Sequence, residues 1–454
     1  MAWRKVTIST FLNERKGRYK PDEAMRMKLK RIDKIDFSNN IHLNETTETK
    51  TDMILVKQGD LVISGINAEK GAIAIYRGQE DIMATIHYSS YTYNEKEIDI
   101  DYLKWFLKSE TFLSTLKEQT KGGIKTELKP NRLLPLEIYL PDKPTQKQIL
   151  KKLNNIEEEV LELEENIDDT ADLLKKLRQS ILQDAVKGKL VPQNPKDEPA
   201  SELLKRNKAE KEKLIKQGKI KKEKPLPLIN ESEIPYDLPN GWAWCRLGEI
   251  ADIGTGATPL TSKKEYYLNG TIPWITSSAT ALPFIDFAET FITQKAIDET
   301  NCKVYPKGTL VIAMYGQGKT RGQITELNLE AATNQACATM SFYIPDLALR
   351  RFVKIFFQKF YNELREDATG SAQPNLNMIK IRTSIIPIPP LTEQSRIVEK
   401  VNQLMALCAS LEKEIAHSKL EADYLLNAIL RETFQHKQKE YSKNEFPISM
   451  AAEQ

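Results

Sequence analysis

The chain has 454 residues, of which 40% are hydrophobic and 28% charged, a composition typical of a globular protein with two or three domains. No apolar stretch approaches the ~20 residues that span a bilayer, and the first residues lack the pattern of a signal peptide. The four cysteines show no CxxC spacing and there are four histidines, so we expect no disulfide framework or zinc site, and a cytoplasmic location. The net charge of +3 does not by itself indicate a nucleic-acid partner.

Residues 1–144 are predicted to form a strand-rich globule with basic and polar loops. Such loops suit phosphate anchoring, with side chains left over for base edges. The alternative is an ordinary polar surface, since exposed loops are polar in most proteins. The DNA-binding candidates in this globule are Arg15, Lys16, Arg18, Lys20, Ser64, Asn67, Lys70, Lys121 and Lys125.

Residues 145–190 are predicted as a long helix, ending near residue 186, after the joint marked by Pro141 and Pro144. Its apolar residues recur at alternating steps of three and four, which is the spacing of a coiled-coil seam. The alternative is an amphipathic helix packed on its own globule. Thr170 occupies one seam position. The apolar seam positions are Leu153, Ile156, Val160, Leu163, Ile167, Leu174, Leu177 and Ile181.

Residues 191–235 are predicted to be a basic linker with a short helical piece from Ser201. Within residues 205–224, ten Lys and Arg residues stand against three Glu residues. Two interpretations remain open, a solvated linker helix and an arm that contacts phosphates. The Pro and Lys content predicts no core of its own.

Residues 236–391 are predicted to be a second strand-rich globule with Gly-rich loops. Its loops carry Gln and Asn residues, whose amides can pair with adenine. Tyr266, Tyr267 and Trp274 are interpreted as core residues rather than base-stacking ones. The DNA-binding candidates are Thr258, Ser262, Lys263, Lys264, Ser277, Tyr315, Gln317, Lys319, Arg321, Ser371, Gln373 and Asn375.

One motif in this globule imitates an ATP site. Residues 313–320, AMYGQGKT, follow an apolar strand and fit a relaxed phosphate-binding loop. A true loop of this kind opens a helix, whereas the residues after it predict a turn into another strand. No HExxH or Asn-Pro-Pro-Tyr motif is present, and no convincing Glu-x-Lys partner follows the acidic residues after Pro21. We therefore expect no catalytic site and no bound metal.

Residues 392–436 repeat the first helix, and residues 437–454 are predicted as a flexible tail. Residues 121–190 align without a gap with residues 369–438, so the chain contains an internal repeat. Ser418 falls on Thr170, which indicates a register mark, a close crossing or chance. An antiparallel helix pair of roughly 60 Å would hold one globule at each end. The apolar seam positions here are Val401, Leu404, Leu411, Ile415, Leu425 and Ile429, with Cys408 and Ala422 between them.

These features resemble the specificity subunits of type I restriction–modification systems, the HsdS family. The carriers are LPNGW at 238–242, GTGATP at 254–259, IPWI at 272–275, TGSAQPNL at 369–376 and IPPLTEQSRI at 388–397. The resemblance covers nearly the whole chain. The first half departs from it, because it lacks an LPNGW segment and has PTQKQ, from Pro144, where the second half has LTEQS, from Leu391.

The resemblance implies an α+β fold in which each globule is a target-recognition domain for one half of a bipartite duplex DNA site. The two helices would form an antiparallel coiled-coil spacer with pseudo-two-fold symmetry. Two methyltransferase subunits would dock on it and motor-nuclease subunits would join them. S-adenosylmethionine, ATP and Mg²⁺ would belong to these partners, with none bound by this chain. The rival interpretations are a coiled-coil adaptor without DNA readout and a P-loop NTPase.

Overall fold

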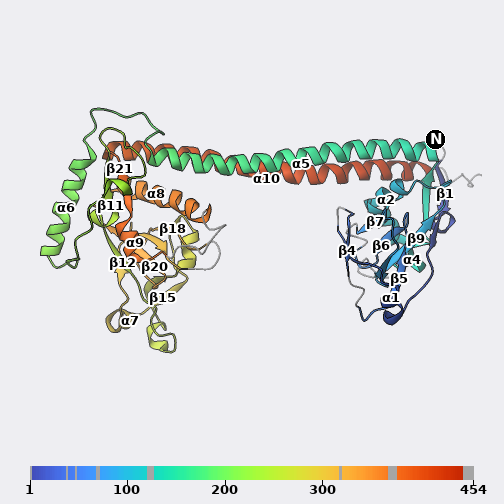
Figure 1. The fold of residues 1–454 in the computed structure, drawn as a ribbon, viewed down its shortest axis with the longest axis horizontal. Helices are drawn as coiled ribbons and strands as arrows, with labels where there is room; N and C mark the ends of the chain where they lie inside the picture. Colours follow the sequence, from blue (N-terminus) through green and yellow to red (C-terminus); the bar gives the residue numbers. More distant parts are fainter. Residues whose placement is uncertain are drawn as a thin grey trace, which may run out of the picture. The chain divides into compact units, whose positions relative to one another are not determined.

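The computed structural model describes residues 3–36, 39–45, 49–67, 72–119, 127–315, 320–366 and 376–442, and its fold is α+β. It divides the chain into two compact units (Figure 1). Unit 1 contains residues 1–169 and 415–454, and unit 2 contains residues 170–414. Each long helix therefore contributes one part to each unit.

The globule of unit 1 contains two four-stranded sheets and a separate strand pair. One sheet has the order β2-β9-β6-β7 and the other β4-β3-β8-β5, in which β3 and β8 run parallel. Strand β1 pairs antiparallel with β10, so the start of the chain lies beside the strand that leads into α5. The elements are β1 (Trp3–Thr7), β2 (Leu12–Glu14), α1 (Pro21–Met27), β3 (Arg31–Ile35), β4 (Ile41–Asn44), β5 (Met53–Val56), β6 (Leu61–Ser64), β7 (Ile73–Ile75), β8 (Ile82–Thr85), β9 (Tyr88–Tyr93), α2 (Ile100–Lys108), α3 (Glu110–Gln119), α4 (Pro130–Leu133) and β10 (Glu137–Pro141).

The globule of unit 2 repeats this topology with one added strand, β14, at the edge of its first sheet. Its sheets have the orders β12-β20-β17-β18-β14 and β15-β13-β19-β16, with β13 parallel to β19, and β11 pairs with β21. The repeat in the sequence is thus a repeat of sheet topology. The elements are β11 (Ala243–Arg246), β12 (Ala251–Thr255), β13 (Ile272–Ile275), β14 (Phe284–Ile285), β15 (Thr290–Ile292), α7 (Gln294–Glu299), β16 (Val304–Tyr305), β17 (Leu310–Ala313), β18 (Ile324–Leu327), β19 (Ala331–Thr333), β20 (Cys337–Phe342), α8 (Leu347–Glu366), α9 (Met378–Thr383) and β21 (Ile385–Ile388).

The long helices are α5 (Lys143–Val186) and α10 (Leu391–Ser442). Gly188, at a φ of +68°, follows the end of α5, where a left-handed residue is the usual helix stop. Helix α10 continues to Ser442, so the predicted tail begins too early at residue 437. The segment after residue 436 is polar but contains no Gly or Pro that would end a helix before Ser442.

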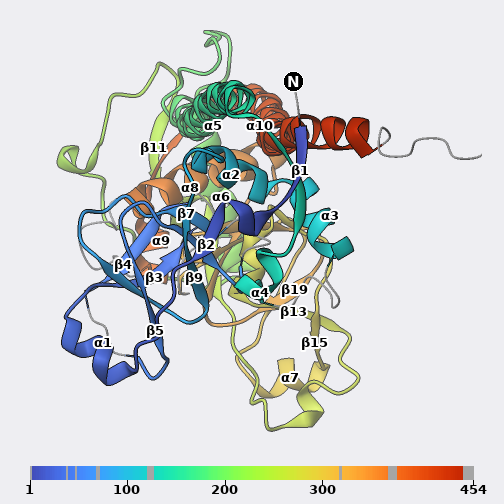
Figure 2. The same cartoon turned by 90° about the vertical axis from the view of Figure 1, so that its right-hand side faces the viewer.

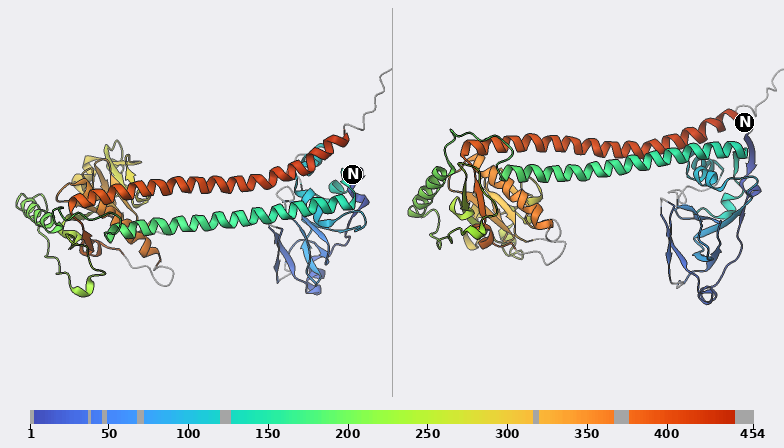
Figure 3. Two further views of the ribbon diagram at one scale, coloured as in Figure 1. Left: turned by 90° about the horizontal axis from the view of Figure 1, so that it is seen from above. Right: turned by 45° about the horizontal axis from the view of Figure 1, so that its top comes forward.

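Within unit 1, the end of α10 lies beside the start of α5 (Figures 2 and 3). Lys419 of α10 forms an ion pair of 2.9 Å with Asp168 of α5. The Phe434 ring packs edge-on against Tyr102 and Phe106 of α2, with ring centroids 5.8 and 5.6 Å apart. This aromatic contact joins α10 to the core of the first globule.

The predicted seam is only partly buried. On α5 the buried residues recur every seven positions, and the intervening leucines are exposed, as Leu163 is by 41% and Leu177 by 48%. Helix α10 shows the same pattern, with Val401 and Cys408 buried and Leu411 and Leu425 exposed by 43% and 46%. The buried stripe on α5 comprises Leu153, Val160, Ile167, Leu174 and Ile181.

The basic linker is part of unit 2. Helix α6 (Ala200–Lys216) buries Ala200 and Leu203 in the same core cluster as Leu247. The buried Arg246 side chain donates hydrogen bonds to the carbonyls of Pro227 and Leu228 and pairs with Glu233 at 2.9 Å. Ala200 and Leu203 of this segment pack into the core of the second globule, and the segment does not form a separate core.

Candidate nucleic-acid interface

The hairpin between β17 and β18 carries several of the predicted DNA contacts. The backbone of Gly322, at a φ of +84°, bonds to Ala313 at 2.8 Å, and β18 follows at Ile324. Among the described residues, the next element after β17 is therefore the strand β18, which argues against the ATP-site interpretation. Tyr315 is 47% exposed at the base of the hairpin. Within the described ranges, the buried Nε of Arg321 has no hydrogen-bond partner.

A second loop, residues 256–259, lies on the end of β19. A side chain at Gly256 would place its Cβ 1.6 Å from the Thr333 carbonyl oxygen, so this close approach requires glycine. The indole of Trp274 donates a hydrogen bond of 3.1 Å to the Ala257 carbonyl, which holds the loop in place. The exposed Thr258 hydroxyl donates to the side chain of Gln335 at 2.5 Å. Thr258 and Gln335 thus form a polar pair on a rigid support.

The aromatic residues of this region belong mainly to the core, as predicted. Tyr266 is 4% exposed and Trp274 is 9% exposed, while Tyr267 is half-buried and donates to the Pro259 carbonyl at 2.6 Å. These rings hold the loops that carry the candidate residues and do not form a stacking surface.

The two adjacent lysines of this region differ in their surroundings. Lys263 donates to the hydroxyl of Tyr266 at 2.9 Å and lies 3.5 Å from Glu299. The hydrogen bond with Tyr266 is the main cause of a raised pKa of Lys263. Lys264 is exposed, as is Ser262. Lys264 is therefore the better placed of the two for a phosphate contact.

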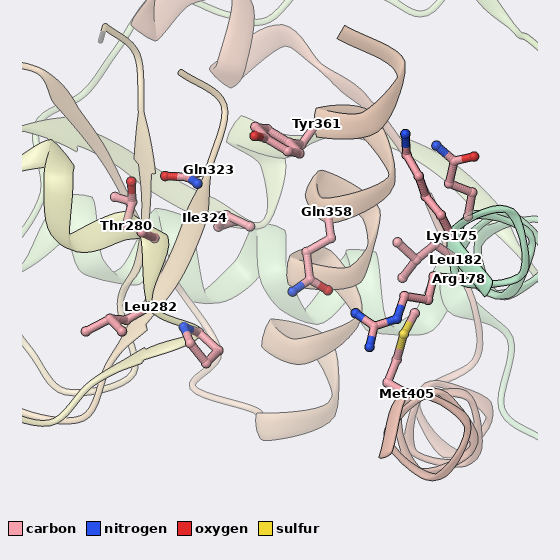
Figure 4. Close-up of a pocket in the computed structure, with 13 residues that line it drawn as sticks. Lys175, Arg178, Leu182, Thr280, Leu282, Gln323, Ile324, Gln358, Tyr361 and Met405 are labelled. Carbon is pink, nitrogen blue, oxygen red and sulfur yellow. The ribbon is translucent and has the colours of Figure 1, made fainter. Parts of the chain in front are cut away.

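Ser277 begins the 3-10 helix η6 (Ser277–Ala281), which borders a groove of about 410 Å³ (Figure 4). Gln323 and Ile324 of the β17–β18 hairpin form part of its wall, and Gln358 and Tyr361 of α8 lie across from them. The groove thus continues from the hairpin toward the long helices of unit 2. Its further lining residues are Lys175, Arg178, Gln179, Leu182, Thr280, Ala281, Leu282, Pro283 and Met405.

One wall of this groove is held by a buried lysine. Lys354 of α8 donates a hydrogen bond to the Pro283 carbonyl, and its ammonium group lies 3.9 Å from the centre of the Phe284 ring. Burial lowers the pKa of Lys354 to about 8. Beside it, Arg350 pairs with the buried Glu326 at 2.8 Å. These contacts fix the segment after η6 on α8.

In unit 1, the predicted DNA contact Arg15 is engaged inside the globule. Its guanidinium donates two hydrogen bonds, of 2.6 and 2.7 Å, to the carboxylate of Asp60. Asp60 is 2% exposed and also accepts from the hydroxyl of Ser90 at 2.7 Å. The bond to Asp60 is the first cause of the raised pKa of Arg15. Arg15 therefore has a structural role in joining β2, β6 and β9.

The residues that follow Arg15 are more accessible. Lys16 and Arg18 are exposed, and Lys20 is exposed with an ion pair of 3.1 Å to Asp52. Gly17 between them has a φ of +134°, which favours glycine. By contrast, Ser64 is only 5% exposed, so its hydroxyl does not reach a ligand without a rearrangement. Asn67 is half-buried.

Several candidates lie outside the described residues, and for them the DNA-binding prediction stays a prediction. They are Lys70, Lys121, Lys125, Gln317, Lys319, Ser371, Gln373 and Asn375.

Gln335 was missed by the sequence analysis. It lies in the turn between β19 and β20, and the TNQ segment from Thr333 was its only signal. Among the described residues there is no group of three or more His, Cys, Asp and Glu side chains that could hold a metal ion. In the same part of the chain, no helix combines the length and apolarity needed to cross a membrane.

Comparisons with known proteins agree with this architecture. Residues 239–421 match the family model of the type I restriction modification DNA specificity domain. The specificity subunit of the type I restriction enzyme EcoAI from Escherichia coli is 36% identical over 250 residues, which are 53% of this chain and 41% of the relative. The EcoEI specificity subunit from Escherichia coli is 31% identical over 267 residues, 56% of this chain and 44% of the relative. The matched region thus covers less than half the length of each relative.

Two solved structures share the fold over nearly the whole chain. The HsdS subunit from Thermoanaerobacter tengcongensis has a TM-score of 0.54 at 19% identity and covers 95% of this chain and 96% of that one. A chain from a study of complex assembly and conformational transition in the type I R-M system has a TM-score of 0.60 at 19% identity, with coverages of 95% and 97%.

Proposed function

We propose that the chain is a member of the HsdS family of type I specificity subunits and that it recognises a bipartite sequence in duplex DNA. The observation that carries the proposal is the duplicated sheet topology of the two globules. Two domains of one architecture on one chain suit a target of two separate halves. The chain itself would carry out no chemistry.

Recognition would be divided between base and phosphate contacts. We assign base contacts in the second globule to the hairpin residues Tyr315 and Arg321 and to the pair Thr258 and Gln335, because an amide oriented by a neighbour can read a base edge. Lys264 in this globule, and Lys16, Arg18 and Lys20 in the first, would contact phosphates, because exposed ammonium and guanidinium groups suit that role.

The long helices would serve as an antiparallel coiled-coil spacer with pseudo-two-fold symmetry. Two ion pairs support this arrangement, Arg178 with Glu412 at 2.8 Å in unit 2 and Lys419 with Asp168 at 2.9 Å in unit 1. From the first pair to the second, the residue number falls on α5, from Arg178 to Asp168, and rises on α10, from Glu412 to Lys419, as antiparallel helices require. The spacer would keep the bases between the two half-sites unread.

The helices would also dock two methyltransferase subunits, to which motor-nuclease subunits bind. Large apolar side chains are exposed on both helices, among them Leu173 by 63%, Leu407 by 57% and Tyr424 by 70%. These side chains would supply the apolar part of the docking face. S-adenosylmethionine, ATP and Mg²⁺ would be bound by those partners, in the cytoplasm.

Duplex binding by the complex of this chain with its methyltransferase, measured against salt concentration, tests the proposal. A DNA reader gives nanomolar affinity for its site and a steep loss of affinity as salt rises. An adaptor that binds only proteins gives no salt-dependent duplex affinity, and that result would refute DNA recognition. Nucleotide turnover by the purified chain would instead favour the NTPase alternative.

A further inference from the structure

A groove of about 700 Å³, hereafter the linker groove, lies beside α6 in unit 2. Cations from three segments line it: α6, the segment that follows it, and α9. Six cations stand there against three carboxylates. The cations are Lys205, Lys208, Lys211, Lys222, Lys224 and Arg382, and the carboxylates are Glu212, Glu223 and Glu249.

The walls of the linker groove are held by packing around Gly248. Lys211 donates a hydrogen bond of 2.7 Å to the Gly248 carbonyl. A Cβ at Gly248 would lie 2.8 Å from Cγ of Arg382 and 3.2 Å from Cδ1 of Leu226. Leu226 therefore helps to hold the linker on the globule. Leu204, Ile215 and Pro225 also line the groove, and most of its charged lining residues are cations.

The positive charge of the linker groove is only partly neutralised. Arg382 pairs with Glu223 at 2.8 Å, yet its buried Nε has no hydrogen-bond partner among the residues that the structure describes. Lys208, Lys222 and Lys224 are exposed, and no carboxylate within the described ranges pairs with their ammonium groups. Burial, and next the charge of Arg382, lower the pKa of Lys211. An anion in the groove would relieve this crowding of like charge.

We propose that the linker groove is a second DNA contact, which binds the sugar–phosphate backbone outside the bases that the second globule reads. This inference rests on the proposed function. Lys208, Lys222 and Lys224 have no carboxylate partner among the described residues, and exposed ammonium groups suit phosphate contacts. No Asn, Gln or Arg other than Arg382 lines the groove, so the contact is independent of sequence.

The position of α6 separates this contact from base recognition. Within unit 2, α6 lies on the far side of the globule from β18 and its hairpin (Figure 1). The lining of the linker groove contains none of the residues assigned to base contacts. The groove therefore adds affinity for DNA that extends beyond the second half-site, without changing which bases are recognised.

The test uses the complex with the methyltransferase and two duplexes of the target site, one ending at the second half-site and one extended by about two helical turns. The groove variant combines Lys208→Ala, Lys222→Ala and Lys224→Ala. On the extended duplex, we expect the slope of log affinity against log salt to fall by about 2.7, at ~0.9 per phosphate contact. On the short duplex the slope of the variant should equal that of the wild type.

The control variant combines Lys189→Ala, Lys196→Ala and Lys307→Ala, three exposed lysines of unit 2 outside the groove. It removes the same net charge and should keep the wild-type slope on both duplexes. Equal slopes for the groove variant and the control would overturn the proposal. Loss of the methyltransferase from the groove variant would overturn it in favour of a protein contact. Failure of the wild type to bind any site would instead refute the proposed function.

Discussion

The side-chain amide of Gln394 donates a hydrogen bond of 2.8 Å to the carbonyl of Pro389, at the joint between the second globule and α10. The same bond, also 2.8 Å long, joins Gln146 to Pro141 where the first globule meets α5. Both glutamines are fully buried. Pro141 is the last residue of β10 and Pro389 directly follows β21, and in each case the glutamine binds the proline carbonyl. The two joints are therefore built alike.

The two glutamines should differ in their effect on stability. Gln146 donates to the Glu97 carbonyl as well and accepts from the Asp99 amide at 2.7 Å, whereas the buried Oε1 of Gln394 has no partner among the described residues. We expect Gln146→Ala to lower the free energy of unfolding by more than Gln394→Ala, for which about 1–3 kcal/mol is expected. Urea denaturation of both variants measures this. A larger loss for Gln394→Ala would contradict the account.

Phe434→Ala should destabilise unit 1 and leave unit 2 unchanged. The Phe434 ring is 1% exposed between Tyr102 and Phe106, and its removal leaves a cavity that costs about 3–5 kcal/mol. Hydrogen exchange read by peptide should show faster exchange in α2, while the strands of the second globule keep their protection. Tyr424→Ala, at a residue 70% exposed on the same helix, is the control. Unchanged exchange in α2 would show that α10 does not dock there.

Lys354 should make unit 2 more stable as pH rises above 8. Its pKa is lowered by burial from 10.5 to about 8, so between these values the unfolded chain binds more protons than the folded one. Stability therefore increases with pH through this window, by about 3 kcal/mol if the whole shift applies. Melting temperatures of wild type and Lys354→Met at pH 7 and 9.5 isolate the effect, because other groups titrate in both. An equal pH response of the two proteins would refute it.

Arg321→Ala should weaken binding to the target duplex by about 5-fold to 150-fold, as expected for the loss of one base contact of roughly 1–3 kcal/mol. Discrimination at one base position of the second half-site should relax with it. Lys307→Ala, at an exposed lysine near the opposite end of β17, should leave affinity and discrimination unchanged. Fluorescence anisotropy with single-base site variants measures both. If the two substitutions have the same effect, Arg321 does not read a base.

Much of the architecture is predictable because it depends on periodic patterns. The apolar heptad spacing predicts α5 and α10, and the repeat alignment predicts two globules of one kind. The exposed leucines such as Leu163 were not predictable, since a heptad pattern cannot tell a buried helix contact from a face left for a partner. The end of α10 was missed because polar helix formers give no apolar periodicity.

The candidate site was less predictable, because side-chain partners depend on tertiary contacts. Arg15 was predicted as a DNA contact, but Asp60, distant in sequence, engages its guanidinium. The linker was expected to lack a core of its own. Helix α6 buries three residues, among them Ala200 and Leu203, against the second globule. Composition alone does not show on which surface a short helix packs. Gln335 is a candidate contact only because its side chain accepts a hydrogen bond from Thr258.

The most direct test of DNA recognition is methylation-site sequencing of DNA from cells that carry this chain with the methyltransferase proposed as its partner. The account predicts a split motif with a fixed unread gap, which disappears when this chain is deleted. Exchange of residues 236–391 for those of a relative should change one half of the motif and leave the other half unchanged. An unaltered methylation pattern after deletion, with the methyltransferase active, would contradict the account.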